Sequence, residues 1–258
     1  MRIAVQIYEI QNSQEAEAVI ELGVDRIGSV ILSEQRWKVP AIKEAIRVSN
    51  GAGVKHSLIP LFNTEGVLFR AIEYYQPDII HFCESLTHDD GHMMPCEALI
   101  ERQCRVRERF PGIAVMRSVP IPAPDRTQGI PTLGIVERFE AVTDYFLIDT
   151  WLGKEPVEGY LGITGRPCDW RAARRLVGSS ETPVVLAGGL SPENVYEGVM
   201  AVRPFGADSC TRTNAEGSNG GFVRFKKDYE KVKAFVAEVR RAEKDLSNLR
   251  TPREGEGI

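Results

Sequence analysis

The sequence predicts a single-domain α/β fold, a (β/α)₈ TIM barrel, and three observations lead to that prediction. Short apolar runs alternate with amphipathic helical segments eight times within about 240 residues. The apolar runs are continuous rather than interrupted at every second residue, which is typical of parallel strands buried on both faces. The chain has 258 residues, and eight such units in that length fit a closed barrel better than an open doubly wound sheet.

The first half of the chain contains four strand–helix units. An apolar run at residues 3–8 precedes a helical pattern whose N-cap is expected at Ser13. The next run, at residues 25–32, precedes a helix that is expected to end at Gly51. The third unit spans residues 54–75, and the fourth consists of a strand at 78–84 and a helix near 96–110.

The second half repeats the pattern four times. Strands are expected at residues 113–121, 144–151, 182–190 and 206–213, followed by helices at 133–142, 169–178, 191–202 and 225–244. The residues after these are polar and contain glycine, which is typical of a fraying terminus. We therefore expect the barrel to cover residues 1–244 and a flexible tail to cover residues 245–258.

The composition excludes several classes of protein. Hydrophobic residues make up 43% of the chain, which is enough to build a core and excludes a disordered protein. The formal net charge of −4 arises from mixed signs, so we expect no nucleic acid and no membrane as partners. No apolar run approaches the roughly 20 residues that span a bilayer. The five cysteines form no C-x-x-C pair, which indicates a reducing, cytoplasmic location rather than a disulfide framework.

Two glycine-bearing loops predict an anion site. In a barrel of this kind the active site lies at the C-terminal ends of the strands, and a phosphate commonly binds after the seventh and eighth. One loop, residues 162–165, runs directly into a helix, and the other contains Gly188 and Gly189. Glycines let backbone N–H groups approach an anion closely, and a helix N-terminus adds a favourable dipole. The alternative is that these glycines only make tight turns.

Four segments in this part of the chain resemble phosphoribosylanthranilate isomerases. They read LIDT (147–150), GITGRPCDW (162–170), LAGGLSPENV (186–195) and GAD (206–208). The family has L-D-T/S, G-G-T-G-x-x-F-D-W and L-A-G-G-L-x-P-x-N-V in the same order. The resemblance is strong over residues 147–210 and weaker over residues 1–40. It implies an aldose–ketose (Amadori-type) isomerase of tryptophan biosynthesis that acts on a phosphorylated sugar derivative and needs no metal or organic cofactor.

The resemblance also implies roles for individual residues. The acid that protonates the ring oxygen falls on Asp149, and the arginine that holds a substrate carboxylate falls on Arg36. The end of the eighth strand departs from the family's S-S-G and reads Cys210-Thr211-Arg212, so Arg212 either pairs with the phosphate or blocks its site. The substrate-binding positions implied in the loops are Gly162, Thr164, Gly165, Gly188, Gly189, Thr211 and Arg212.

The base of the family has no direct counterpart. Where the family has a cysteine in K-I-C-G, this chain has Tyr8, and a phenol with a reference pKa of about 10 is mostly protonated at neutral pH. Tyr8 is one candidate for the replacement base. The other is Cys83, which ends the fourth strand on the same side as His81 and could act as a thiolate assisted by that histidine.

Three functions therefore stay open at this point. The chain is a diverged isomerase of a phosphorylated sugar derivative, the family's own isomerase with a substituted base, or a non-catalytic protein that binds or senses a phosphometabolite. Retention of Asp149 and Arg36 favours an enzyme, and a monomer or homodimer is expected. Residues 81–96 contain histidines, cysteines and acidic residues, but their spacing matches no established zinc pattern, so we expect no metal.

Overall fold

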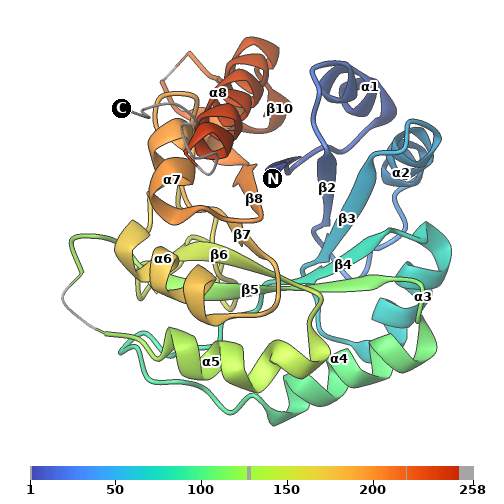
Figure 1. Cartoon of the computed structure of the whole chain (residues 1–258). Helices are drawn as coiled ribbons and strands as arrows, with labels where there is room; N and C mark the ends of the chain where they lie inside the picture. Colours follow the sequence, from blue (N-terminus) through green and yellow to red (C-terminus); the bar gives the residue numbers. More distant parts are fainter. Residues whose placement is uncertain (1, 127–128, 219, 250–258) are drawn as a thin grey trace, which may run out of the picture.

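The computed structural model describes residues 2–126, 129–218 and 220–249, and it confirms the predicted (β/α)₈ barrel. Eight parallel strands follow one another around the barrel, and β8 pairs with β1 to close it. Figure 1 shows the helices arranged around the outside of these strands. The barrel strands are β1 (Ala4–Ile7), β2 (Arg26–Ile31), β3 (Lys55–Pro60), β4 (Ile79–Phe82), β5 (Ala114–Pro122), β6 (Tyr145–Trp151), β7 (Val184–Leu186) and β8 (Gly206–Ser209).

Eight α-helices connect or follow these strands in the part of the chain that the structure describes. The first begins one residue away from its expected cap, because the side chain of Asn12 rather than Ser13 accepts the Glu15 backbone N–H at 2.9 Å. The helices are α1 (Ser13–Glu21), α2 (Pro40–Gly51), α3 (Glu65–Tyr75), α4 (Glu97–Arg109), α5 (Thr132–Phe139), α6 (Trp170–Ser179), α7 (Val195–Val202) and α8 (Tyr229–Asn248).

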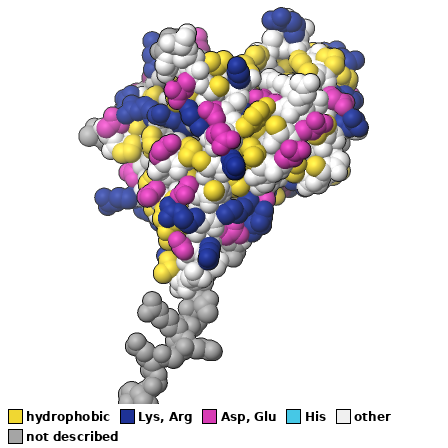
Figure 2. Space-filling view, turned by 90° about the horizontal axis from the view of Figure 1, so that it is seen from above, with side chains coloured by type: hydrophobic (Ala, Val, Ile, Leu, Met, Phe, Trp, Pro, Cys, Tyr) yellow, Lys and Arg dark blue, Asp and Glu magenta, His cyan; other side chains and the backbone are white. Residues whose placement is uncertain are grey.

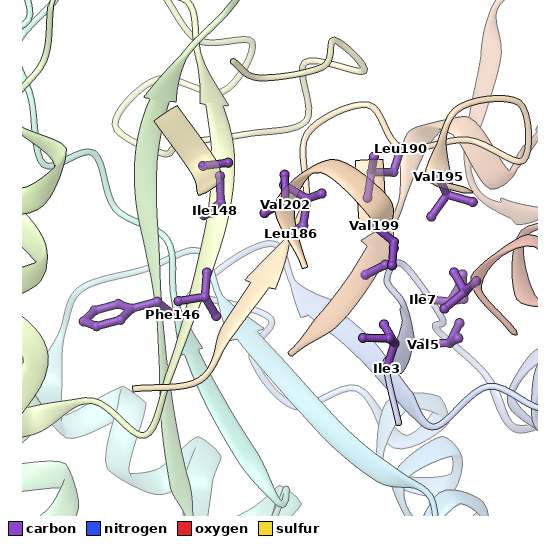
Figure 3. Packing of buried hydrophobic residues seen from close by; sticks show 14 of the residues in the cluster. Ile3, Val5, Ile7, Phe146, Ile148, Leu186, Leu190, Val195, Val199 and Val202 are labelled. Carbon is purple, nitrogen blue, oxygen red and sulfur yellow. The ribbon is translucent and has the colours of Figure 1, made fainter. Parts of the chain in front are cut away.

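The main core lies between the strands and the helices. Ile3, Val5 and Ile7 are fully buried there and belong to the same cluster as Val199 of α7 (Figure 3). Successive side chains of a strand point to opposite faces. Gln6 of β1 therefore points into the barrel, and so does Tyr8, which directly follows this strand. Tyr8 belongs to a separate inner cluster.

An antiparallel hairpin follows β8 where the sequence analysis expected a loop and then a helix. It consists of β9 (Asn214–Glu216) and β10 (Phe222–Lys227), and residue 219 between them lies outside the described residues. Helix α8 begins only after this hairpin. The Asp228 side chain caps it by accepting the backbone N–H groups of Glu230 and Lys231.

Helix α8 runs past residue 244, where the sequence analysis expected the barrel to end. The helix continues to Asn248, and Leu246 is buried in the main core. The Tyr196 hydroxyl of α7 donates a hydrogen bond to Asp245 Oδ2 at 2.9 Å. These contacts hold residues 245–248 on the barrel, and the rest of the expected tail, 250–258, lies outside the described residues.

The surface carries both signs of charge. On the face shown in Figure 2, Lys and Arg side chains are interspersed with Asp and Glu, with no large area of a single sign. Within the described ranges, no helix is long and apolar enough to cross a membrane.

Candidate active site

Two adjoining cavities lie at the C-terminal ends of the barrel strands. The first, here called the central cavity, encloses about 560 Å³ including its solvent-open mouth and reaches down to Tyr8, His81 and Leu147 inside the barrel. The second, here called the loop cavity, encloses about 310 Å³ between the segments that follow β6, β7 and β8. Both cavities are lined by Asp149, Ile163, Asp208 and Cys210, so their shared wall carries two carboxyl groups.

The loop cavity brings together residues from three separate loops that the sequence analysis assigned to substrate binding. It is lined by Thr164, Gly165, Gly188, Gly189, Thr211 and Arg212. Gly189 has a φ of 59°, and a side chain there would overlap the Arg166–Pro167 backbone. Close backbone approach therefore requires glycine at this point, and the opposite loop can lie directly against it.

Gly162 leaves room for the Asp149 carboxyl and does not line the loop cavity. Its φ is 104°, and a Cβ at this position would overlap the Asp149 carboxyl.

Helix α6 follows the 162–165 loop, and its N-terminus has fewer free backbone N–H groups for an anion than the sequence analysis expected. The Asp169 side chain already accepts the Arg171 and Ala172 backbone N–H groups at the start of α6.

Arg212 lines the loop cavity, and no carboxylate among the residues that the structure describes forms an ion pair with it. Its Nε donates a hydrogen bond to the Gly165 carbonyl at 2.8 Å, and its guanidinium lies over the Phe222 ring. A neutral carbonyl is the partner of this cation in the structure. The charge therefore remains available to an anion in the loop cavity.

Asp149 occupies the position expected of the acid, near the end of β6. Burial raises the pKa of its carboxyl to about 7, although Oδ1 accepts the Thr150 backbone N–H at 2.7 Å. A carboxyl group with a pKa near neutrality can hold a proton and release it at physiological pH.

Tyr8 is held as a neutral phenol, which argues against the predicted role as a base. Its side chain is 4% exposed, and its hydroxyl lies 2.6 Å from both Ser57 Oγ and His81 Nδ1. Burial raises the pKa of the hydroxyl well above its usual value. The ring lies directly on Gly28 of β2, where any Cβ would overlap it.

Cys83 lines the central cavity, but the structure does not pair it with His81 as expected. The two nitrogens of His81 are engaged by the Tyr8 hydroxyl and, at 2.8 Å, by Ser118 Oγ. Burial lowers the pKa of His81 to about 3 and raises the pKa of the Cys83 thiol. Neither residue is therefore poised to form the thiolate that the sequence analysis considered.

Arg36 does not reach either cavity. It is exposed in the loop that follows β2, whereas Val30 of the same strand lines the central cavity. The arginine that lines the central cavity is Arg224 of β10, which the sequence analysis did not assign to the site.

Glu9 also lines the central cavity, although alternation along a strand that continued past Tyr8 would place the two side chains on opposite sides. Strand β1 ends at Ile7, and Glu9 adopts a φ of 64° that turns its side chain into the cavity wall. It is 2% exposed and pairs with Arg224 at 2.6 Å. The early end of the strand could not be inferred from an apolar run that continues to Tyr8 and Ile10.

Asp208 is a further residue of the cavity walls to which the sequence analysis gave no role. It lies in β8 beside Gln6 of β1, whose Nε2 donates to Asp208 Oδ1 at 3.1 Å. Burial raises the pKa of this carboxyl to about 8, and the nearby Asp149 charge acts in the same direction. The sequence does indicate this residue, because Asp208 is the acidic residue of the GAD segment and lies at an inward-facing position of the eighth strand.

The loop after β4 was weighed as a metal site. His92 Nδ1 lies 3.2 Å from the Asp90 carboxylate, and both side chains are largely exposed. Among the residues that the structure describes, no group of three or more His, Cys, Asp or Glu side chains could hold a metal ion.

Comparisons with known proteins find one recurrent family. A family model described as N-(5'phosphoribosyl)anthranilate (PRA) isomerase matches residues 116–238. An N-(5'-phosphoribosyl)anthranilate isomerase of Methanosarcina acetivorans is 25% identical over 245 residues, which cover 93% of this chain and 94% of the relative. The corresponding protein of Methanocella arvoryzae is 40% identical over 103 residues, or 40% of this chain and 42% of the relative.

A solved structure is similar over nearly the whole barrel. It is a phosphoribosyl anthranilate isomerase in complex with reduced 1-(o-carboxyphenylamino)-1-deoxyribulose 5-phosphate. The TM-score is 0.65 at 20% sequence identity, with 93% of this chain and 99% of that chain covered. At this identity the likeness shows a shared fold.

Proposed function

Because the chain belongs to the phosphoribosylanthranilate isomerase family, we propose that it isomerises a phosphorylated aldose derivative to the corresponding ketose. The observation that carries this proposal is the place of Asp149, whose side chain lines both the central cavity and the loop cavity. A sugar phosphate bound across the two cavities has its phosphate among the loops and its ring beside this carboxyl.

The loop cavity is the proposed phosphate site. Thr164, Gly165, Gly188 and Gly189 supply backbone and hydroxyl donors from two loops, and Arg212 supplies a positive charge from a third. A phosphate fixed in this way orients the sugar, which lowers the entropic cost of reaching the transition state. Gly162 keeps the Asp149 carboxyl close to the loop by leaving room for it.

Asp149 is the proposed acid of the reaction. Ring opening breaks the bond between the anomeric carbon and the ring oxygen, and that oxygen takes up a proton as the bond breaks. A buried carboxyl group whose pKa is raised to about 7 supplies this proton at neutral pH. The reaction moves protons within one molecule and requires no metal or organic cofactor.

The cellular context of the proposal follows from the family. We place the protein in tryptophan biosynthesis in the cytoplasm, as a monomer or homodimer whose partner is a phosphorylated small molecule rather than nucleic acid or a membrane. N-(5'-phosphoribosyl)anthranilate is the first substrate to test, because it is the substrate named for the relatives.

Two experiments test the proposed reaction. Purified protein should convert N-(5'-phosphoribosyl)anthranilate to the ketose product, and expression should restore growth without tryptophan to a bacterium that lacks this isomerase. Well-folded protein that gives neither turnover nor growth would rule out this substrate.

A non-catalytic binding protein is the second candidate, and the locked Tyr8 favours it. Tyr8 is a neutral phenol whose hydroxyl is hydrogen-bonded to Ser57 and His81. It occupies the position at which the resemblance to the isomerase family implies a base. For such a protein, titration calorimetry would show binding of a sugar phosphate without turnover. Asp149→Asn would then leave that affinity nearly unchanged, because an acid needed only in the transition state adds little to ground-state binding.

A further inference from the structure

The proposed isomerisation needs a base, and the groups that line the central cavity can be tested against that role one by one. Tyr8 and His81 hold each other in a buried hydrogen-bond network. Burial raises the pKa values of the Cys83 and Cys210 thiols, and it raises that of Tyr160 to about 12. These groups hold their protons, or in the case of His81 remain neutral with both nitrogens occupied, at neutral pH.

Glu9 is ionised but already fully engaged. Its Oε1 accepts Arg224 Nε at 2.7 Å, and its Oε2 accepts Asn214 Nδ2 at 3.0 Å. Burial acts to raise the pKa of this carboxyl, but the Asn214 hydrogen bond and the Arg224 charge outweigh it and lower the pKa. A carboxylate with both oxygens paired is a weak base and a good anchor for the hairpin.

Asp208 differs from Glu9 in its hydrogen bonding. Its side chain is 6% exposed, and only Oδ1 has a donor among the described residues, which is Gln6 Nε2. The other carboxyl oxygen is left for the cavities, and Asp208 lines both of them together with Asp149. Asp208 of β8 pairs directly with Gln6 of β1. Gln6 lies two residues before Tyr8, which occupies the position of the family's cysteine.

We propose that Asp208 is the base of the reaction and works as a pair with Asp149 across the wall between the two cavities. This inference rests on the proposed function. Two carboxyl groups that interact in a buried site share one proton over a range of pH, so one member is an acid while the other is a base. Burial raises the pKa of both carboxyl groups, to about 7 for Asp149 and about 8 for Asp208. For an interacting pair these values describe the titration of the pair and do not say which member holds the shared proton.

The proton balance of the reaction uses both carboxyl groups. In the first step the C1′–O4′ bond breaks, its electron pair stays on O4′, and O4′ takes the proton of Asp149 while the nitrogen lone pair forms a C1′=N double bond. In the second step the C2′–H bond breaks, and Asp208 takes the proton. The C–H electron pair forms a C1′=C2′ double bond, and the C1′=N pair returns to nitrogen.

Tautomerisation of this enaminol then gives the ketose. Asp208 returns its proton to C1′, the C2′ hydroxyl loses its proton to water, and Asp149 regains a proton from water. Each carboxyl group ends as it began, and no oxidant or reductant takes part.

Chemical rescue tests this role. In the full-length protein, Asp208→Asn should lower kcat for N-(5'-phosphoribosyl)anthranilate by about 10²–10⁴-fold, the usual contribution of a positioned base. Asp208→Ala should show the same loss, and added formate should restore part of the turnover because it fits the space left by the carboxyl group. Asp90→Asn, an exposed carboxylate in the loop after β4, is the matched control and should keep wild-type turnover.

The binding of inorganic phosphate, measured by calorimetry, separates loss of chemistry from loss of structure. Both Asp208 variants should still bind phosphate and show a cooperative thermal transition. Wild-type turnover that persists in Asp208→Asn, or a loss in Asp208→Ala that formate does not relieve, overturns the assignment of Asp208 while the isomerase function stands. Wild-type protein without turnover overturns both.

Discussion

Replacing Tyr8 by Phe separates a structural role of this residue from a catalytic one. The variant keeps the ring against Gly28 but removes the hydroxyl that lies 2.6 Å from Ser57 Oγ and 2.6 Å from His81 Nδ1. A buried polar group left without its hydrogen bond costs about 1–3 kcal/mol. Because His81 keeps its bond to Ser118, we expect the free energy of unfolding to fall by about 2 kcal/mol.

Chemical and thermal unfolding measure this change, and turnover measures its effect on catalysis. For a chain of this size, about 2 kcal/mol corresponds to a fall of about 4–8 °C in Tm. Turnover of N-(5'-phosphoribosyl)anthranilate should stay near the wild-type value, because the phenol transfers no proton in the proposed reaction. A Tyr8→Phe protein with wild-type stability and a loss of about 10²-fold or more in kcat would refute this reasoning and make Tyr8 the base.

Three further predictions concern Asp149 as the proposed acid, its neighbour Gly162 and the exposed Arg36. Gly162→Ala places a Cβ on the Asp149 carboxyl, so kcat should fall by about 10²-fold or more, and retained turnover would contradict the packing. The folded-state pKa of Asp149, about 7, lies above an unfolded value of about 4, so its contribution to stability is lost as the pH rises between these values. Asp149→Asn should therefore flatten that part of the stability–pH curve in denaturation experiments, and an unchanged slope would argue against the raised pKa. Arg36→Ala should leave KM unchanged in steady-state kinetics, because Arg36 lines neither cavity; a large rise in KM would restore the role implied by the family.

Asp149 and the loop cavity could be predicted from the sequence because their signals are local. A continuous apolar run leads to Asp149, and closely spaced glycines mark loops that must approach each other. The barrel topology then brings the ends of neighbouring strands together without further information.

The hairpin and the state of Tyr8 could not be predicted, because both depend on contacts that are distant in the sequence. Phe225 has a φ of 61°, and its N–H points to the Glu9 carboxylate at 3.4 Å, so β10 takes its shape from the start of the chain. The hydroxyl of Tyr8 is fixed by side chains 49 and 73 residues away. Residue type and parity place a phenol inside the barrel but do not reveal which partners will lock it.

The pairing of Glu9 with Arg224 has a consequence for the order in which the chain folds during synthesis. Glu9 emerges from the ribosome early, whereas Arg224 lies 215 residues later and emerges near the end. A buried carboxylate without its cation is strongly destabilising. Closure of the barrel around Glu9 is therefore unfavourable until β10 has been made, and the amino-terminal strand remains open to solvent while the other strands assemble. A nascent chain that stops short of Arg224 lacks the cation of this pair and cannot complete the wall of the central cavity.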